Sequence, residues 1–275
     1  MKIRNILLVI TAALCVVSCS KEDNLPTVAE IAGNYDGYTL ANSTYFQNKC
    51  TDKETIAITE NTDGSAKVSF KSTTWGDFMI DKAQISKTGD FYTLTGKGKA
   101  SMGRGDKKSS YDCELSAKIS SKTNAQIQFK IPAVMGGLTI DFMVGKAPVE
   151  LLLAGSYKGY TNAGCKYFQN KYTENETVQV TANKDKTLTV TFESKVWGSF
   201  KAPTVTITQK GEEYTFTGKG TVAMGMSDKK NDYDFTVTGT KNIAKDTYVI
   251  VFHVPAVMGG LTITLNPGTA PSATN

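Results

Sequence analysis

The chain consists of two copies of one sequence unit. The stretch AGNYDGY at residues 32–38 returns as AGSYKGY after an offset of 122 residues. The same offset aligns two copies of YFQNK, at residues 45–49 and 167–171. After one inserted residue, PAVMGGLTI at 132–140 returns at 255–263. A duplication of this length predicts two domains of one fold joined in tandem.

Each unit is a series of short alternating segments separated by turn residues, a pattern typical of antiparallel strands. In the first unit we expect strands at residues 33–41, 54–60, 66–73, 78–87, 91–102, 110–120, 125–131 and 138–145. A meander of eight sequential strands removes its exposed edges by closing on itself. The sequence therefore predicts an all-β protein of two tandem eight-stranded antiparallel up-and-down β-barrels.

The two-residue period assigns side chains to the inside and the outside of each barrel. The inward set of the first unit is Ile56, Ile58, Val68, Phe70, Ala83, Ile85, Tyr92, Leu94, Tyr111, Cys113, Leu115, Ile127, Phe129, Leu138, Ile140 and Phe142. The inward set of the second unit is Val178, Val180, Val190, Phe192, Val205, Ile207, Tyr214, Phe216, Tyr233, Phe235, Val237, Ile250, Phe252, Leu261, Ile263 and Leu265. We expect one apolar interior per unit, with no repeated charge in its lining.

Glycines also fall on the inward positions, at Gly96 and Gly98 and again at Gly218 and Gly220. Missing side chains at these positions either let the strand bend at a barrel corner or open space inside the barrel. An eight-stranded barrel is filled by its side chains or leaves room for one small ligand. Both interpretations stay open at this stage.

A similar lead-in precedes each unit, at residues 26–32 and 148–154. The second, with Pro148 before a leucine-rich stretch, predicts a short helical turn that plugs the open end of its barrel. We expect barrel 1 at residues 31–148, barrel 2 at 149–268 and a disordered tail at 269–275.

The first residues predict export. Lys2 and Arg4 precede the apolar run 6–17, which is too short to span a membrane and is typical of a signal peptide at residues 1–18. Val16 to Cys19 resembles the bacterial lipobox, which makes Cys19 the expected lipid attachment site and residues 19–30 a tether. The acidic stretch that follows resembles the signal that sends lipoproteins of Bacteroidota to the cell surface. We therefore expect an outer membrane lipoprotein that is held by its N-terminal lipid anchor. The leading hypothesis places it on the cell surface, and the periplasmic face stays open because a flexible charged tether would have the same sequence.

Charge and residue types argue against several functions. Past residue 18 the chain holds 29 basic and 26 acidic residues, and its lysines are scattered along the sequence, so we expect no nucleic-acid partner. The chain has one histidine, His253, whose strand position points it outward. With no His/Cys cluster and no histidine aimed at a nucleophile, we expect no metal, no cofactor and no enzyme activity.

Three cysteines follow Cys19. Cys50 and Cys113 both change to aromatic residues in the second unit, Tyr172 and Phe235, and Cys165 has no such counterpart. One hypothesis is a disulfide between Cys50 and Cys113 with Cys165 free, since export permits oxidation. The alternative is two independent buried positions that accept any apolar group.

Aromatic and methionine residues recur near the predicted turns. Such residues give recognition surfaces large and adaptable contacts, although repeated residues also serve packing. Both the core and the ligand-rim interpretation stay open for Trp75 and Trp197. The candidate ligand-binding residues are Tyr38, Tyr45, Trp75, Met102 and Met135 in the first unit and Tyr160, Tyr167, Trp197, Met224 and Met258 in the second.

The Ala-Gly-x-Tyr-x-Gly openings, the eight strands and the two Pro-Ala-Val-Met-Gly-Gly-Leu segments resemble the calycin-like barrel domain of Bacteroidota lipoproteins, within the superfamily of lipocalins and fatty-acid-binding proteins. Tyr35 and Tyr157 stand where lipocalins carry a tryptophan, so a lipocalin ligand site is not transferable. Two hypotheses remain. The leading one is a non-enzymatic lipoprotein that binds a small apolar or amphipathic molecule in or at the mouth of its barrels. The other is an interaction lipoprotein with filled barrels, whose loops contact an envelope protein or a glycan.

Overall fold

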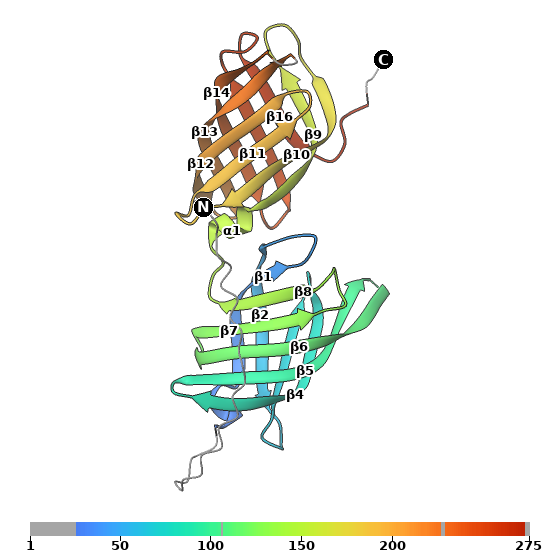
Figure 1. Ribbon diagram of the computed structural model, residues 1–275, viewed down its shortest axis with the longest axis vertical. Coiled ribbons are helices and arrows are strands. Elements are labelled where there is room, and N and C mark those ends of the chain that lie inside the picture. The colour runs from blue at the N-terminus through green and yellow to red at the C-terminus, as the bar shows by residue number, and fades with distance from the viewer. Residues whose placement is uncertain (1–25, 106, 227–228, 273–275) are drawn as a thin grey trace.

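The structure, a computed structural model, describes residues 26–105, 107–226 and 229–272. It consists of two closed barrels, each with eight antiparallel strands in sequential order, as predicted (Figure 1). Barrel 1 contains β1 (Gly33–Asn42), β2 (Lys49–Glu60), β3 (Ala66–Ser72), β4 (Gly76–Thr88), β5 (Phe91–Arg104), β6 (Lys107–Ser121), β7 (Asn124–Ile131) and β8 (Leu138–Val144). Barrel 2 contains β9 (Gly155–Gly164), β10 (Lys171–Ala182), β11 (Leu188–Ser194), β12 (Gly198–Lys210), β13 (Glu213–Met226), β14 (Lys229–Asn242), β15 (Thr247–Val254) and β16 (Leu261–Pro267).

Each barrel has a plug at the end where its first strand begins. The plugs are a 3-10 turn, η1 (Val28–Glu30), and a short helix, α1 (Val149–Leu153). Val28 and Leu153 are fully buried in the core of their own barrels. The tyrosine of each Gly-x-Tyr opening holds its plug, because Tyr35 Oη donates to Ile31 O at 2.6 Å and Tyr157 Oη donates to Leu153 O at 2.7 Å. This end is called the plug end below, and the opposite end is called the tip.

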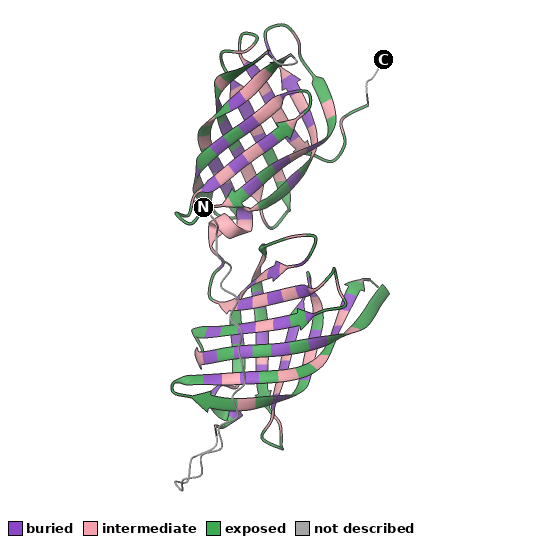
Figure 2. Cartoon of the chain, viewed as in Figure 1, coloured by how far each residue is buried: buried purple, intermediate pink, exposed green. Residues whose placement is uncertain are grey.

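Each barrel has its own core, and no residue belongs to both. Buried and exposed residues alternate along the strands (Figure 2), and the predicted inward sets are buried apart from the half-buried Ile85, Tyr111, Ile207 and Tyr233. Phenylalanine rings fill the centre. In barrel 1, the rings of Phe70, Phe78 and Phe129 lie 5.1 to 5.6 Å apart. In barrel 2, Phe192, Phe200, Phe235 and Phe252 form contacts at 5.1 to 5.8 Å.

The inward glycines allow close approach of neighbouring strands. A Cβ on Gly98 would lie 2.1 Å from Met79 O, and one on Gly220 would lie 2.1 Å from Lys201 O. Both glycines face a register shift in the preceding strand, where the sheet bends. The bending interpretation is therefore confirmed, and the space above these glycines is occupied by backbone.

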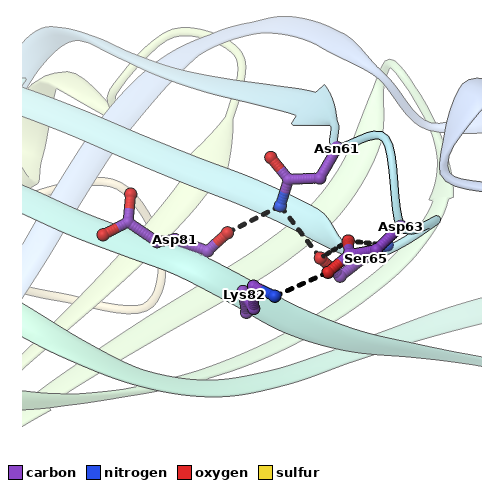
Figure 3. A network of polar contacts seen from close by, with 5 residues as sticks. All are labelled: Asn61, Asp63, Ser65, Asp81 and Lys82. Carbon is purple, nitrogen blue, oxygen red and sulfur yellow. Dashed lines mark hydrogen bonds and ion pairs between the residues drawn. The ribbon is translucent and has the colours of Figure 1, made fainter.

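The turns at the plug end are closed by polar contacts (Figure 3). Asn61 Nδ2 donates to Ser65 Oγ at 2.9 Å and to Asp81 O at 2.7 Å, which joins the β2–β3 turn to β4. Asp63 accepts the Ser65 backbone N–H at 3.1 Å and forms an ion pair with Lys82 at 2.7 Å. The charge of Asp63 in the turn is therefore paired with that of Lys82 in β4.

Cys50 and Cys113 are not bonded to each other in the structure, and both are free, as is Cys165, which favours the alternative hypothesis of two independent positions. Lys53 adopts a left-handed φ of 58° within an irregularity of the β1–β2 pairing. Such a bulge shifts the alternation of side chains along the strand. Cys50 therefore faces a pocket outside the barrel, whereas Cys113 lies in the core.

The N-terminal predictions lie mostly outside the described residues, which begin at Pro26. They include the signal peptide, Cys19 and all but the last residues of the tether. Of the tail predicted at 269–275, the structure describes residues 269–272, where the Ala270 N–H donates to Glu174 Oε1 at 2.7 Å. In the described part of the chain, neither helical segment has the length and apolar character that crossing a membrane requires.

Candidate binding surface at the barrel tips

Two loops at the tip of each barrel project an exposed tyrosine and an exposed methionine. In barrel 1, Tyr45 lies in the β1–β2 loop and is 79% exposed, and Met135 lies in the β7–β8 loop and is 46% exposed. Their counterparts in barrel 2, Tyr167 and Met258, are 73% and 50% exposed. We call loops 43–48 and 132–137 tip surface 1, and loops 165–170 and 255–260 tip surface 2.

The same backbone bonds join the two loops of each tip surface. Thr44 N donates to Met135 O and Lys166 N donates to Met258 O, both at 3.3 Å. Within the first loop, the side chain of Gln47 donates to Ser43 O at 2.8 Å, and Gln169 makes the equivalent bond to Cys165 O at the same distance. The tyrosine and the methionine are therefore presented by a tied pair of loops.

Both methionines are held in a strained conformation. Met135 has a φ of 51° and Met258 a φ of 49°, in the left-handed region that non-glycine residues rarely adopt. Such strain costs about 1 to 3 kcal/mol and persists only where surrounding contacts enforce it. The glycine that follows each methionine completes the tight turn, with φ of 68° at Gly136 and 70° at Gly259.

A tryptophan supports each tip surface from below. Trp75 and Trp197 are each 4% exposed, which favours the core interpretation of these two candidates. The Trp75 Nε1 group donates to Thr39 Oγ1 at 2.9 Å, and the Trp197 Nε1 group donates to Thr161 Oγ1 at 3.0 Å. Each tryptophan also lies beside a phenylalanine of the tip loop, with ring centroids 5.9 Å apart at Phe46 and 6.3 Å apart at Phe168.

A buried carboxyl group lies beneath each tryptophan, contrary to the predicted absence of repeated charge. Glu54 is 5% exposed and accepts a hydrogen bond from Ser72 Oγ at 2.7 Å, and that hydroxyl oxygen accepts the Trp75 N–H at 3.1 Å. Glu176 and Ser194 repeat the bond at 2.7 Å in barrel 2. Burial raises the pKa of both carboxyl groups, and the serine hydrogen bond partly opposes this.

Sequence reasoning missed these carboxyl groups although a signal was present. Glu54 shares the inward alternation of Ile56 and Ile58, and the pattern recurs at Glu176. An acidic residue that twice falls on the buried side of a strand indicates a polar network at the barrel end rather than a solvated face.

The remaining candidates contribute no exposed side chain to the tip surfaces. Met102 is buried in the core of barrel 1, and Met224 packs half-buried against that of barrel 2. Tyr38 lies on the outer wall, where its hydroxyl donates to Met143 Sδ at 3.3 Å, and the ring of Tyr160 lies 6.1 Å from that of Tyr172. The structure thus brings together Tyr45 with Met135 and Tyr167 with Met258 only.

The two pockets that stand out among the described residues lie outside the barrels. The larger, about 1030 Å³, opens between the barrels and is lined by α1, the start of β2 and the β12–β13 and β14–β15 turns. The smaller, about 480 Å³, lies on the outer wall of barrel 1 around Lys97 and Glu114. The packed phenylalanines occupy the barrel centres, so the geometry gives no support to a ligand held inside.

Titratable groups form no recognisable catalytic or metal centre in the described part of the chain. No group of three or more His, Cys, Asp and Glu residues is placed to hold a metal ion there. His253 faces outward, as predicted, and its Nδ1 lies 3.1 Å from Thr262 Oγ1 on the neighbouring strand.

The fold and the duplicated tip surfaces define a tandem β-barrel of the kind that typically serves binding. Sequence comparison matches residues 31–144 and 153–266 to the calycin-like beta-barrel domain family, and the chain belongs to that family. No curated protein matches the chain.

Solved structures also match the chain. One is described as a "putative outer membrane protein" from Bacteroides fragilis; it is 22% identical with a TM-score of 0.64, covering 87% of this chain and 98% of the other. At this identity the similarity shows the fold alone. A second structure, a protein of unknown function from Nostoc punctiforme, is 10% identical with a TM-score of 0.24. The match covers 87% of this chain and 97% of the Nostoc protein.

Proposed function

We propose that this chain is a non-enzymatic lipoprotein of the cell envelope that binds another envelope component through its two tip surfaces. The barrels act as solid supports that hold the tip loops in place. The observation that carries the proposal is the identity of exposed residues between the two repeats.

Packing explains why buried residues are alike in both units, but it does not explain the tips. The loop sequences YFQNK and PAVMGGLT are identical in both repeats, although Tyr45 and Met135 lie in solvent. The plug-end turns have diverged in the same chain, since NTDGS at 61–65 is replaced by NKDKT and KTGD at 87–90 by QKGE. A shared binding task at the tips accounts for this difference.

The residue types suit recognition. Tyrosine and methionine are enriched in the core of protein interfaces, where the tyrosine ring gives a large contact area at low entropic cost and methionine adapts its shape to a partner. The tied loops reduce the entropy lost on binding, because they are already ordered.

A small apolar ligand inside the barrels, the leading hypothesis from the sequence, receives less support. Aromatic rings pack in both interiors, and the inward glycines face neighbouring backbone or the side chains of Ile80 and Val205 rather than a cavity. The lipobox resemblance supports the lipid anchor, the acidic stretch after Cys19 supports location in the outer membrane, and both are part of the proposal.

The proposal is tested by native electrophoresis of detergent-extracted envelopes. We expect the wild type to migrate in a complex larger than the single chain, and the double variant Tyr45→Ser/Tyr167→Ser to migrate as the free chain. The matched control is Phe91→Ser/Tyr172→Ser, which removes two aromatic residues of 38% and 39% exposure outside the tip surfaces. Unchanged migration of the tip variant, or an apolar molecule retained by the barrels in native mass spectrometry, would contradict the proposal.

A further inference from the structure

Charge is segregated along each barrel. We define the tip loops as residues 42–49, 72–76, 102–103, 105, 107–109 and 131–138 in barrel 1 and 164–171, 194–198, 224–225, 230–231 and 254–261 in barrel 2, which leaves out the positions whose side chains the structure does not describe. The charged residues of these loops are Lys49, Lys107 and Lys108 in barrel 1 and Lys166, Lys171, Lys195 and Lys230 in barrel 2. The formal charge of the tip loops is therefore +3 and +4. Past residue 18 the net charge is +3, so the rest of the chain carries −4.

The lysines of the tip loops are far apart in sequence, but the up-and-down topology brings every second connection to the same end of a barrel. Lys166 lies in the β9–β10 loop and Lys195 in the β11–β12 loop, and both are exposed. The fold brings these lysines together at one end of the barrel, so a search for runs of charge along the sequence does not detect them.

The lysines of tip surface 2 lack acidic partners among the described residues. No ion pair with a described residue involves Lys166, Lys171 or Lys195. Lys171 instead lies over the ring of Trp197, with Nζ 5.3 Å from the ring centroid. At the plug ends, by contrast, Lys82 pairs with Asp63 at 2.7 Å and Lys241 pairs with Asp246.

Apolar groups lie among these lysines. Tyr167 and Met258 are exposed at the tip of barrel 2, and Val196 in the β11–β12 loop is a third exposed apolar side chain there, at 48%. A surface that combines free ammonium groups with exposed aromatic and aliphatic side chains is complementary to carboxylates placed around an apolar anchor.

The topology separates the tips from the expected anchor. The chain enters barrel 1 at the plug end, and a 14-residue strand such as β5, tilted as in other barrels, places the tip about 35 Å away. The tether between Cys19 and the plug reaches at most about 30 Å. If Cys19 carries a lipid anchor in a membrane, the tether keeps the plug end within about 30 Å of that membrane, whereas tip surface 1 lies at the opposite end of the barrel. This arrangement favours a protein partner over that membrane.

Resting on the proposed function, we infer that the partner of the tip surfaces is an envelope protein that presents an acidic segment with apolar side chains. The lysines steer and orient that segment, and the tyrosine and methionine provide the contact area. Tip surface 1 repeats the tyrosine and the methionine, but Thr44, Thr73 and Thr74 stand there in place of Lys166, Lys195 and Val196. The acidic segment therefore binds at tip surface 2.

The test uses the full lipoprotein in the producing cell, with a photo-crosslinking amino acid at position 167 and, as a control, at the exposed plug-end position 91. We expect position 167 to capture one protein and position 91 to capture none of it. Carbodiimide coupling, which joins lysine amines to carboxylates in contact, should link Lys166, Lys171 or Lys195 to Asp or Glu residues of that same protein. Raising the salt of isolated envelopes from 50 to 500 mM before irradiation should lower the yield about fivefold.

A matched pair of charge variants completes the test. Lys195→Gln/Lys230→Gln should lower the crosslink yield at least about threefold, whereas Lys184→Gln/Lys210→Gln, which removes the same charge from the plug end, should leave it unchanged. A lipid or a glycan captured at position 167, or a protein whose capture ignores salt and both variants, would overturn the acidic-segment inference and leave the proposed function standing. Equal capture at positions 167 and 91 would overturn both.

Discussion

The structure gives a clear physical cause for the raised pKa of the buried Glu54 carboxyl group. Its neighbours in the hydrogen-bond network are Ser72, Trp75 and Thr39, none of which carries a charge, and burial is the largest cause of its raised pKa. A carboxylate that loses water without gaining an ion pair destabilises the folded state. The repetition of this arrangement at Glu176 indicates that the tip geometry needs an acceptor at that place.

The first prediction concerns the pH dependence of stability. Because the folded pKa lies above the ordinary value of 4.5, the folded protein holds more protons than the unfolded chain between the two values. Stability should therefore fall as pH rises through that interval and stay lower above it.

Glu54→Gln keeps an acceptor for Ser72 without a charge, so we expect it to be more stable than the wild type at pH 8, with a smaller difference at pH 4. Urea unfolding at both pH values measures this, and Glu60→Gln, at an exposed position, is the control. An equal difference at both pH values would argue against a buried charge.

At this scale the sequence predicts the core better than the site. Most side chains that alternation predicted to point inward are buried, because burial in a barrel follows strand parity. The predicted sets missed Phe78 and Phe200, which lie before the register shifts of β4 and β12, where the parity changes. Alternation could not separate Tyr45, which is exposed, from its neighbour Phe46, which packs on Trp75. Loop residues take their exposure from turn geometry and from contacts between distant loops, and neither is periodic in sequence.

The strands of each barrel depend on a few irregular positions. The register shift in β4 between Met79 and Gln84 brings the backbone against Gly98, and β12 does the same against Gly220. The sequence indicated these bends through the glycines. It did not reveal the bulges at Lys53 and Asn175, where non-glycine residues adopt left-handed conformations.

The second prediction tests the close approach. Gly98→Ala places a methyl group 2.1 Å from Met79 O, so we expect a loss of about 1 to 3 kcal/mol or misfolding of barrel 1. Gly220→Ala should have the same effect in barrel 2. Thermal unfolding followed by circular dichroism measures the loss, with Lys99→Ala on the exposed face of β5 as the control. A glycine variant as stable as the control would show that the sheet bends without this contact.

The third prediction follows from the bulge at Lys53, which places Cys50 and Cys113 on opposite sides of the barrel wall. Alkylation of the unfolded mature chain without reductant should modify Cys50, Cys113 and Cys165. In the folded chain, burial raises the pKa of Cys50 and of Cys113 to about 12, so both thiols should react slowly at pH 8, with the core residue Cys113 the slower. Mass spectrometry of the alkylated peptides distinguishes the sites. If only one thiol of the unfolded chain were modified, the result would support a disulfide between Cys50 and Cys113.

The whole molecule is two barrels in series rather than one core. The hydrophobic clusters share no residue, and α1, whose Leu153 is buried in barrel 2, also contacts β2 of barrel 1. Across the pocket between the barrels, Lys53 and Glu212 lie 3.9 Å apart with both side chains largely exposed. An exposed pair of this kind contributes at most about 1 kcal/mol. The tandem repeat alone predicted this division.

The last prediction is that the barrels unfold as separate units. Phe129→Ala removes a buried ring that contacts Phe70 and Phe78, and such truncations cost about 3 to 5 kcal/mol. Phe129 belongs to the core of barrel 1, which shares no residue with the core of barrel 2. Amide hydrogen exchange should therefore accelerate throughout β1 to β8, while β9 to β16 keep their wild-type rates. Phe252→Ala, in the equivalent ring cluster, should produce the mirror result. If either variant loosened both barrels together, α1 would have to couple the two cores strongly, and the tips could no longer be regarded as two binding surfaces on independent supports.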